Sequence, residues 1–497
     1  MMSMVPETHF HPSPDRDHLN GPENRPPGSS SPGVTAFWAT AALLGAAFLG
    51  SGALLAQQPE PGQLLYDTDV RIDVEAGSLE VRATVSYRAD EGTAERVSFL
   101  LNHRVRLDEV TGPGVRSHTV ESFEMIPWMV VVEVELDGSV LPGSEVIVEL
   151  RYAGSPEMPP GGINRITEEW VELGLDSGWH PVFATLDQEM LGVVRIELPA
   201  GWDAVGAGRS EKREDLHVIH TTTSQVDVAF AAAPALDELS SENLSIHFPK
   251  AVADAARAVL EAGENCSGYL NRRYGEEDPL PLSHLVLANR QGPSYARNRY
   301  FVLSEVDPDD AVELHRFLCH ELAHHWTGTA GPFTPHHWMS EAFAEFVAAR
   351  YLREHFGRQV YEGIVEEWEE EGRDHGPIWT PEAVERPHPQ VMYRRGPWAL
   401  HRLEHRIGRR QMDRLVERYM IQDIRTTERL LDALEAVAGA EAEAWFREEL
   451  ARPPQRIEGK PSGIGRMGDG GPCSAQVNPD PTRRLRSPSP APPNLPR

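Results

Sequence analysis

The spacing of apolar residues changes once along this chain, and that change constrains the fold more than any other feature. Between about Leu64 and Asp237, apolar and polar residues alternate, which is typical of strands with one face on a core. Turn residues such as Asp137 and Gly138 separate the alternating runs. From about Ser245, apolar residues recur at three- and four-residue steps, which is typical of helices. The 497 residues are therefore predicted to form an α+β multidomain protein, with an antiparallel β domain over residues 60–244 and a mostly α-helical domain over residues 245–455.

The two ends of the chain differ in composition from the rest. Residues 1–33 are rich in Pro, Ser, His and Gly, and residues 456–497 in Pro, Gly and Arg, so both are predicted to be disordered. Residues 34–56 form an almost uncharged apolar stretch. This stretch is interpreted either as a signal peptide cleaved after Ala56 or as a single anchor that attaches the protein to a membrane. Both interpretations predict export, with the remaining chain membrane-anchored, periplasmic or extracellular.

The chain is acidic and poor in cysteine. It has 47 Lys and Arg residues against 76 Asp and Glu residues, a net charge of -29, which argues against a nucleic-acid partner. Its three cysteines are Cys266, Cys319 and Cys473. This number and spacing predict no disulfide framework. Cys319 is expected to be a small buried helix residue, not a metal ligand.

Two histidines lie four residues apart, His320 and His324, with Glu321 directly after the first. Residues 311–326 have helical periodicity and follow two acidic residues, as expected where a helix begins. Side chains at positions i and i+4 of a helix lie on one face, so both rings can bind the same metal ion. A glutamate beside such a pair can reach a water at the metal, which is the arrangement of a zinc hydrolase.

A catalytic zinc needs a third protein ligand, for which Glu341 is the candidate. It lies in a second segment of helical periodicity, residues 338–356. Residues 327–337 contain Gly and Pro and join the two segments as a turn, so the two helices can face each other across the metal. We therefore predict that His320, His324 and Glu341 bind one Zn²⁺ ion and leave a fourth position for water.

These blocks resemble those of the gluzincin zinc metallopeptidases of the aminopeptidase N and leukotriene hydrolase type. His320 and His324 match the two histidine ligands of that family. Glu321 matches its catalytic glutamate, and Glu341 its glutamate ligand, within the block 338–346. Sixteen residues separate His324 from Glu341, two fewer than the family usually has, so the connecting loop is expected to be shorter. The resemblance implies an N-terminal β saddle followed by a thermolysin-like catalytic domain.

A third block extends the resemblance. The family has a Tyr-x-Lys-Gly stretch at the start of a helix, and this chain has Tyr393 to Gly396, with Arg395 in place of the lysine. The resemblance implies that Tyr393 stabilises the oxyanion, and a phenol can indeed donate to an oxygen that becomes negative. Arg395 is expected to be structural.

One block of the family is missing. Aminopeptidases of this type carry an acid on the strand before the zinc helix, and that acid holds the amino group of the substrate. The corresponding stretch here, Gly292 to Tyr300, contains arginines and no acid. Gly292 and Tyr295 are candidates to line the substrate cleft, the alternative being that the stretch is an ordinary edge strand.

Several other polar residues lie near the predicted metal ligands. Glu345 is one helical turn after Glu341, so it either accepts the ring N–H of a ligand histidine or is a solvated or structural acid. Four further histidines could bind metal, although three protein ligands suffice: His315, His325, His336 and His337. The last two could instead line the cleft.

The blocks together predict a zinc-dependent metallopeptidase that hydrolyses bonds in a peptide or protein substrate and is aminopeptidase-like without the usual anchor for an amino terminus. In this hypothesis Glu321 takes a proton from the attacking water and passes it to the leaving nitrogen. The alternative hypothesis is a zinc-bearing, non-catalytic binding or scaffold protein, with the β domain as its functional part. The sequence predicts no oligomeric state.

Overall fold

The structure, a computed structural model, describes residues 59–60, 63–89, 95–138, 140–159, 163–186, 188–225, 227–328, 330–331 and 334–454. All of them belong to one compact unit, Gln57–Arg497. The predictions for residues 1–33, 34–56 and 456–497 lie outside the described residues. Among the helices that the structure describes, none is both long and apolar enough to cross a membrane.

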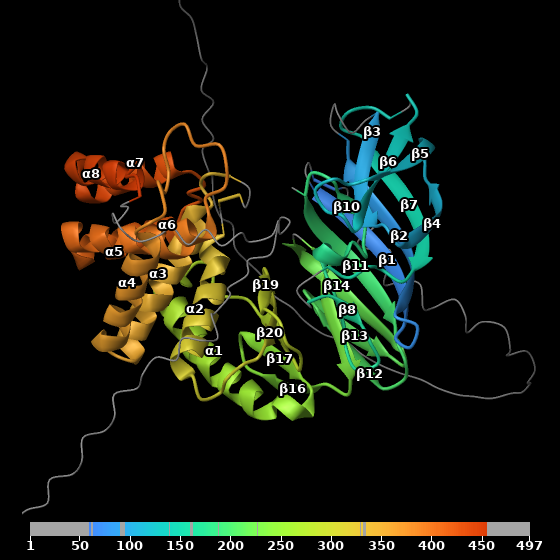
Figure 1. Cartoon of the computed structure of the whole chain (residues 1–497), viewed down its shortest axis with the longest axis horizontal. Coiled ribbons are helices and arrows are strands. Elements are labelled where there is room, and N and C mark those ends of the chain that lie inside the picture. Colours follow the sequence, from blue (N-terminus) through green and yellow to red (C-terminus); the bar gives the residue numbers. More distant parts are fainter. Residues whose placement is uncertain are drawn as a thin grey trace, which may run out of the picture. The chain divides into compact units, whose positions relative to one another are not determined.

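Within the described residues, strands β1 to β15 form three sheets (Figure 1). The seven-stranded sheet has the order β13 (Arg209–Arg213), β14 (Leu216–Gln225), β11 (Glu189–Glu197), β1 (Gln63–Asp73), β2 (Ser78–Arg88), β7 (Glu145–Gly154) and β4 (Val105–Thr111). One four-stranded sheet has the order β10 (Val182–Phe183), β3 (Arg96–Asn102), β6 (Met129–Leu136) and β5 (Val115–Ser122). The other has the order β12 (Trp202–Gly206), β15 (Phe230–Pro234), β9 (Val171–Leu173) and β8 (Arg165–Ile166), and the short helix η1 (Leu175–Ser177) follows β9.

One strand pair departs from the predicted antiparallel arrangement. Strands β1 and β11 run parallel, from Gln63 opposite Glu189 to Arg71 opposite Glu197, whereas the other pairs in these three sheets are antiparallel. The N-terminal domain is therefore antiparallel, as predicted, except at this pair. Alternating residues identify the buried face of a strand, but they do not identify the direction of its neighbour.

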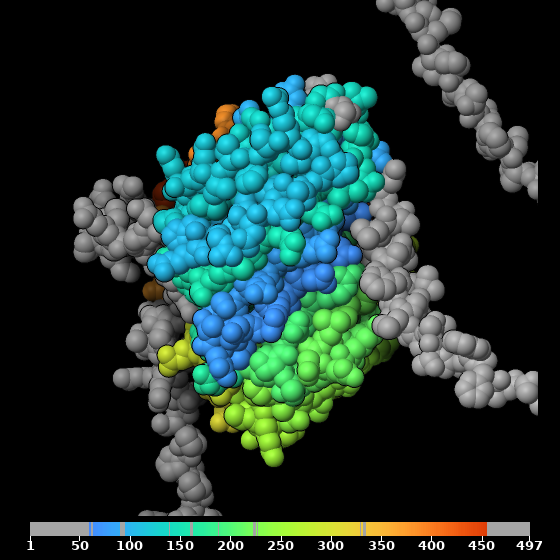
Figure 2. Space-filling model, turned by 90° about the vertical axis from the view of Figure 1, so that its right-hand side faces the viewer, coloured from blue at the N-terminus to red at the C-terminus, as the bar shows by residue number. Residues whose placement is uncertain are grey.

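The predicted alternation is confirmed on β2. Leu79, Val81 and Ala83 are buried, while Glu80 and Arg82 between them are exposed. Residues from all three sheets share one apolar core, including Phe99 of β3 and Phe230 of β15. Figure 2 shows one face of this β-rich region, coloured blue to green, and almost every residue of strand β5 is exposed.

A five-stranded sheet begins the second part of the chain. Its order is β16 (Asp237–Ser240), β17 (Leu244–Phe248), β18 (Ser283–Ala288), β20 (Tyr300–Ser304) and β19 (Tyr295–Arg297). Pairs β17–β18 and β18–β20 are parallel, and β19 forms the edge, as the edge-strand interpretation predicted. Strand β16 lies on the N-terminal side of the predicted boundary at residue 245, yet it pairs with β17 beyond it.

This sheet is joined to the N-terminal sheets by a buried ion pair and a shared core. Arg290 after β18 donates from Nη2 to Glu172 Oε1 at 2.7 Å and from Nε to Oε2 at 2.8 Å, and both side chains are fully buried. Apolar residues from both parts, including Trp170 and Tyr300, pack in the same cluster. Such a bidentate pair fixes β9 relative to the turn that follows β18.

Helices cover the other face of the five-stranded sheet, where Leu285 and Leu287 of β18 enter the largest core cluster. The helices are η2 (Lys250–Val252), α1 (Ala253–Tyr274), α2 (Ala311–Thr327), α3 (Trp338–His355), α4 (Arg358–Gly372), the π-helical turn η3 (Val391–Arg395), α5 (Gly396–Ile407), α6 (Arg409–Ile421), α7 (Thr427–Ala438) and α8 (Ala440–Leu450). Helix α2 begins as predicted, because Asp310 Oδ1 accepts from the Glu313 backbone N–H at 3.1 Å.

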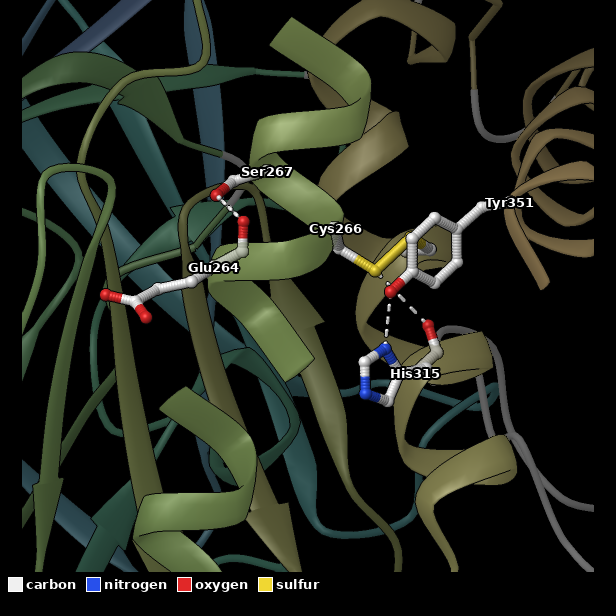
Figure 3. Close-up of a disulfide and its surroundings, with 6 residues drawn as sticks. Glu264, Cys266, Ser267, His315 and Tyr351 are labelled. Carbon is white, nitrogen blue, oxygen red and sulfur yellow. Dashed lines mark hydrogen bonds between the residues drawn. A yellow bond between two sulfur atoms is a disulfide. The ribbon is translucent and has the colours of Figure 1, made fainter. Parts of the chain in front are cut away.

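The structure has a disulfide, which the number and spacing of the cysteines did not indicate. Cys266 of α1 and Cys319 of α2 form a disulfide that spans 53 residues of sequence, and both side chains are buried. Figure 3 shows Cys266 facing His315 and Tyr351, where His315 Nδ1 lies 2.6 Å from the Tyr351 hydroxyl. Cys319 is buried, as expected, but it ties α1 covalently to the helix that carries His320. Cysteine number and spacing do not show where two helices touch, so the pairing needed the tertiary structure.

Candidate active site

Two of the four histidines of α2, His320 and His324, direct their Nε2 atoms towards the same point. The Nε2 atoms of His320 and His324 are 3.2 Å apart. On the other side of each ring, His320 Nδ1 lies 3.2 Å from Glu345 Oε2, and His324 Nδ1 lies 3.0 Å from Thr327 Oγ1, so each ring can donate there in the tautomer that carries its proton on Nδ1. Because each Nδ1 has an acceptor, each ring keeps its Nε2 lone pair for a metal.

Glu341 of α3 completes the group. Its Oε2 atom lies 3.3 Å from His320 Nε2 and 3.4 Å from His324 Nε2. Zinc–ligand bonds of about 2.0–2.1 Å in a tetrahedron separate the ligand atoms by about 3.3 Å, which matches these distances. Oε2 is buried and has no hydrogen-bond partner among the described residues. A buried carboxylate oxygen without a donor is costly, so the oxygen fits a bound cation.

In the described part of the chain, His320, His324 and Glu341 are the one group whose ligand atoms could hold a metal, all within 4.8 Å of one another. Burial alone would lower the pKa of His320, but the carboxylates of Glu341 and Glu345 outweigh it and raise the pKa to about 10. Burial would raise the pKa of Glu341, yet the neighbouring histidines hold it well below its usual value. The Glu341 carboxylate and the His320 imidazole therefore stabilise each other's charged forms in the metal-free protein. A divalent cation bound between them would take the place of the proton on the imidazole.

A second layer of charged side chains holds His320. Glu345 is buried and accepts from Arg316 Nε at 2.9 Å and from the Trp368 ring N–H at 3.2 Å. Arg316 also contacts Glu367 of α4 at 3.0 Å. Burial would raise the pKa of Glu345, but Arg316 and His320 lower it, so the acid stays ionised. Of the two roles considered for Glu345, the structure shows the contact to the ligand histidine.

Glu321 is half-buried on α2, between the two histidines in sequence. Burial raises the pKa of its carboxyl group, while His320 and His324 oppose this rise. A carboxylate whose pKa is raised is a better proton acceptor, which suits a general base.

Tyr393 lies in the π-helical turn η3, directly before α5. Its ring stacks at 5.7 Å on the ring of His320. Burial, then the charges of Glu341 and Glu321, raise its pKa well above the usual value, so the phenol keeps its proton and can donate it. The block ends at Gly396, where a larger residue would not fit, because its Cβ would lie 2.7 Å from the Cβ of Ala342 on α3.

Of the other polar residues near the site, all but His337 have partners outside the group of His320, His324 and Glu341. Arg395 donates to the backbone carbonyls of His375 and Arg452, as expected of a structural residue. The four histidines considered as further metal ligands also have partners: His315 contacts Tyr351, His325 contacts Asp278, His336 contacts Thr427 and His337 contacts Glu341. None of these four rings belongs to the metal group found among the described residues.

The residues proposed for the substrate cleft lie around β19. Gly292 has a φ of +106° and donates its backbone N–H to Glu305 Oε2 at 3.2 Å. Tyr295 is almost completely buried and packs in the cluster shared with the N-terminal sheets. The structure therefore puts the Tyr295 side chain in a core rather than on an open surface.

Sequence reasoning missed Arg316 and the contact made by His337. A signal for Arg316 was present, because it lies four residues before His320, just as Glu345 lies four after Glu341. Residues at these spacings lie on one face of a helix. An ion pair between Arg316 and Glu345, beside the predicted metal ligands, could therefore have been predicted from the sequence.

Comparisons with known proteins agree with this architecture. No protein-family model matches the chain, and no curated protein matches its sequence. The M1 zinc metallopeptidase from Deinococcus radiodurans has a TM-score of 0.59, covering 81% of this chain and 97% of that one at 18% identity. This chain has the M1 metallopeptidase fold. Native yeast leukotriene A4 hydrolase shares the M1 fold with it at a TM-score of 0.63 and 13% identity, covering 80% of this chain and 68% of that one. A variant of the Deinococcus enzyme bound to a Tyr-Ser-Ala substrate matches at a TM-score of 0.56 and 19% identity, covering 81% and 96%.

Proposed function

We propose that this M1-fold protein is a zinc-dependent metallopeptidase that hydrolyses peptide bonds. The observation that carries the proposal is the convergence of His320 Nε2, His324 Nε2 and Glu341 Oε2 at the separations expected for zinc ligands. Further support comes from Glu321 and Tyr393, because a purely structural zinc site needs neither a base nor a phenol.

The residues have separate tasks in this proposal. His320, His324 and Glu341 would hold the zinc, which when bound supplies Lewis acidity to water and to the substrate carbonyl. Glu321 accepts a proton from the attacking water and returns it to the leaving nitrogen. Tyr393 donates its hydroxyl proton in a hydrogen bond to the carbonyl oxygen as that oxygen becomes negative.

Replacing Tyr393 with phenylalanine is expected to lower kcat about 10²- to 10³-fold with little change in KM. The reason is that the hydroxyl acts on charge that develops only in the transition state. Steady-state kinetics on a cleaved peptide, together with zinc content, would measure this. Equal kcat in Tyr393→Phe and the unmodified protein would remove Tyr393 from the reaction.

Strand β19 bears on which end of a peptide the protein would recognise. Arg297 of β19 stands on the strand where the family has its amino-anchoring acid, and its side chain contacts Asp227 at 3.1 Å and Asp176 at 3.4 Å. Two carboxylates of the N-terminal region, one in η1 and one between β14 and β15, therefore lie beside this strand. Incubating the zinc-loaded protein with a mixed peptide library, followed by mass spectrometry of the products, would show whether it cuts at an end or internally. Absence of any cleaved peptide would count against the peptidase proposal.

We also propose that the protein works in an oxidising compartment outside the cytoplasm. The Cys266–Cys319 disulfide supports this, because such bonds persist mainly in exported proteins. Independently, the apolar stretch 34–56 leads us to expect export, because it is interpreted as a signal peptide or a membrane anchor. Alkylation of free thiols in protein taken directly from its source cells, before and after reduction, would test the proposal. Three free thiols before reduction would contradict it.

A further inference from the structure

The two carboxylate oxygens of Glu341 have different neighbours. Oε2 faces His320 and His324, whereas Oε1 lies 3.1 Å from His337 Nε2. The Glu341 side chain is 7% exposed and that of His337 is 12% exposed, so water has little access to this contact.

The His337 ring has an acceptor near each of its two nitrogens. His337 lies directly before α3 and four residues before Glu341, so its side chain can reach the carboxylate from the same helix face. Its Nδ1 atom lies 3.4 Å from the backbone carbonyl of Ala330 in the loop between α2 and α3. With a proton on Nε2, the ring donates to Oε1 and leaves Oε2 unpaired.

We propose that His337 is a positioning residue that holds Glu341 so that a single oxygen faces the zinc. This inference rests on the proposed zinc site and adds a residue outside the ligand set. Without the imidazole donor, Oε1 would lose its contact with His337, and the carboxylate could turn both oxygens towards the metal. Binding both would occupy the position that water needs.

The two other roles considered for His337 fit less well. A metal ligand would direct a free ring nitrogen at the group formed by His320, His324 and Glu341, but Nε2 is bonded to Oε1. As a cleft residue His337 would offer little surface to a substrate, because its side chain is 12% exposed and its Nε2 faces Glu341.

Three variants test the proposal. His337→Leu removes the donor at similar volume, and His337→Gln retains an N–H donor at about the position of Nε2. His336→Leu is the matched control, because that neighbouring imidazole accepts from the Thr427 N–H at 3.1 Å and does not contact Glu341. For each variant, zinc affinity is measured by competition with a chelator, and the absorption spectrum of the Co²⁺-loaded protein reports metal geometry.

We expect His337→Leu to weaken zinc binding about 10- to 100-fold and to alter the Co²⁺ spectrum. His337→Gln should restore most of the affinity, and His336→Leu should bind zinc as the unmodified protein does. Unchanged affinity in His337→Leu, or an equal loss in His336→Leu, would overturn the proposal. If the unmodified protein binds zinc yet cleaves no peptide, the proposed function fails while this test of His337 still stands. If it binds no zinc, both fail.

Discussion

Replacing Glu321 with glutamine is expected to reduce kcat for peptide cleavage by about 10²- to 10⁴-fold while the protein keeps its zinc. The amide cannot accept a proton from the attacking water, whereas the three ligand side chains are unchanged. The raised pKa that burial gives this carboxyl group is the property that is lost. Initial rates on a cleaved peptide and zinc content, measured on the same preparation, would show the two effects separately.

The matched control is Glu264→Gln, which changes an exposed glutamate of α1 in the same way. It should leave both turnover and zinc content unchanged. This comparison also separates the two functional hypotheses, because a zinc-bearing scaffold would show no turnover in any of the three proteins. Turnover that survives in Glu321→Gln would instead assign the proton transfer to another group.

Removing the Cys266–Cys319 disulfide is expected to lower the free energy of unfolding by about 4 kcal/mol, the loop-closure value for a bridge that spans 53 residues. The change is Cys266→Ala with Cys319→Ala, which avoids leaving buried thiols. Chemical denaturation monitored by circular dichroism measures the loss. Because Cys319 directly precedes His320, zinc retention should also fall at lower denaturant concentrations in the variant.

Cys473→Ala serves as the control, since it removes the third cysteine and keeps the bridge. It should unfold with the same midpoint as the unmodified protein. Identical unfolding of the double variant and the unmodified protein would show that the bridge adds no stability to the region around the zinc helix.

Local spacing made much of the site predictable. The segment 311–326 was predicted to be helical and is α2, because its apolar periodicity and its acidic start act within a few residues. The position of Glu341 followed from its block on α3. The histidine spacing was enough to place both rings on one face, and the structure brings all three side chains together.

Features that depend on distant contacts were not predictable. The disulfide needed the point where α1 and α2 touch, and the parallel pairing of β1 with β11 needed a register between strands far apart in sequence. The periodicity of apolar residues predicts which face of each helix or strand is buried, but it does not predict which element packs against that face. The burial of Tyr295 also depends on distant contacts, because residues of the N-terminal sheets pack against it.

Metal content is the most direct test of the central claim that His320, His324 and Glu341 bind one zinc ion. Inductively coupled plasma mass spectrometry of the purified protein, after gel filtration, should find one zinc per chain. His320→Ala and Glu341→Gln should lose it, while His336→Leu should retain it. A chain purified without zinc even after incubation with Zn²⁺, or one zinc per chain that persists in His320→Ala, would contradict the account.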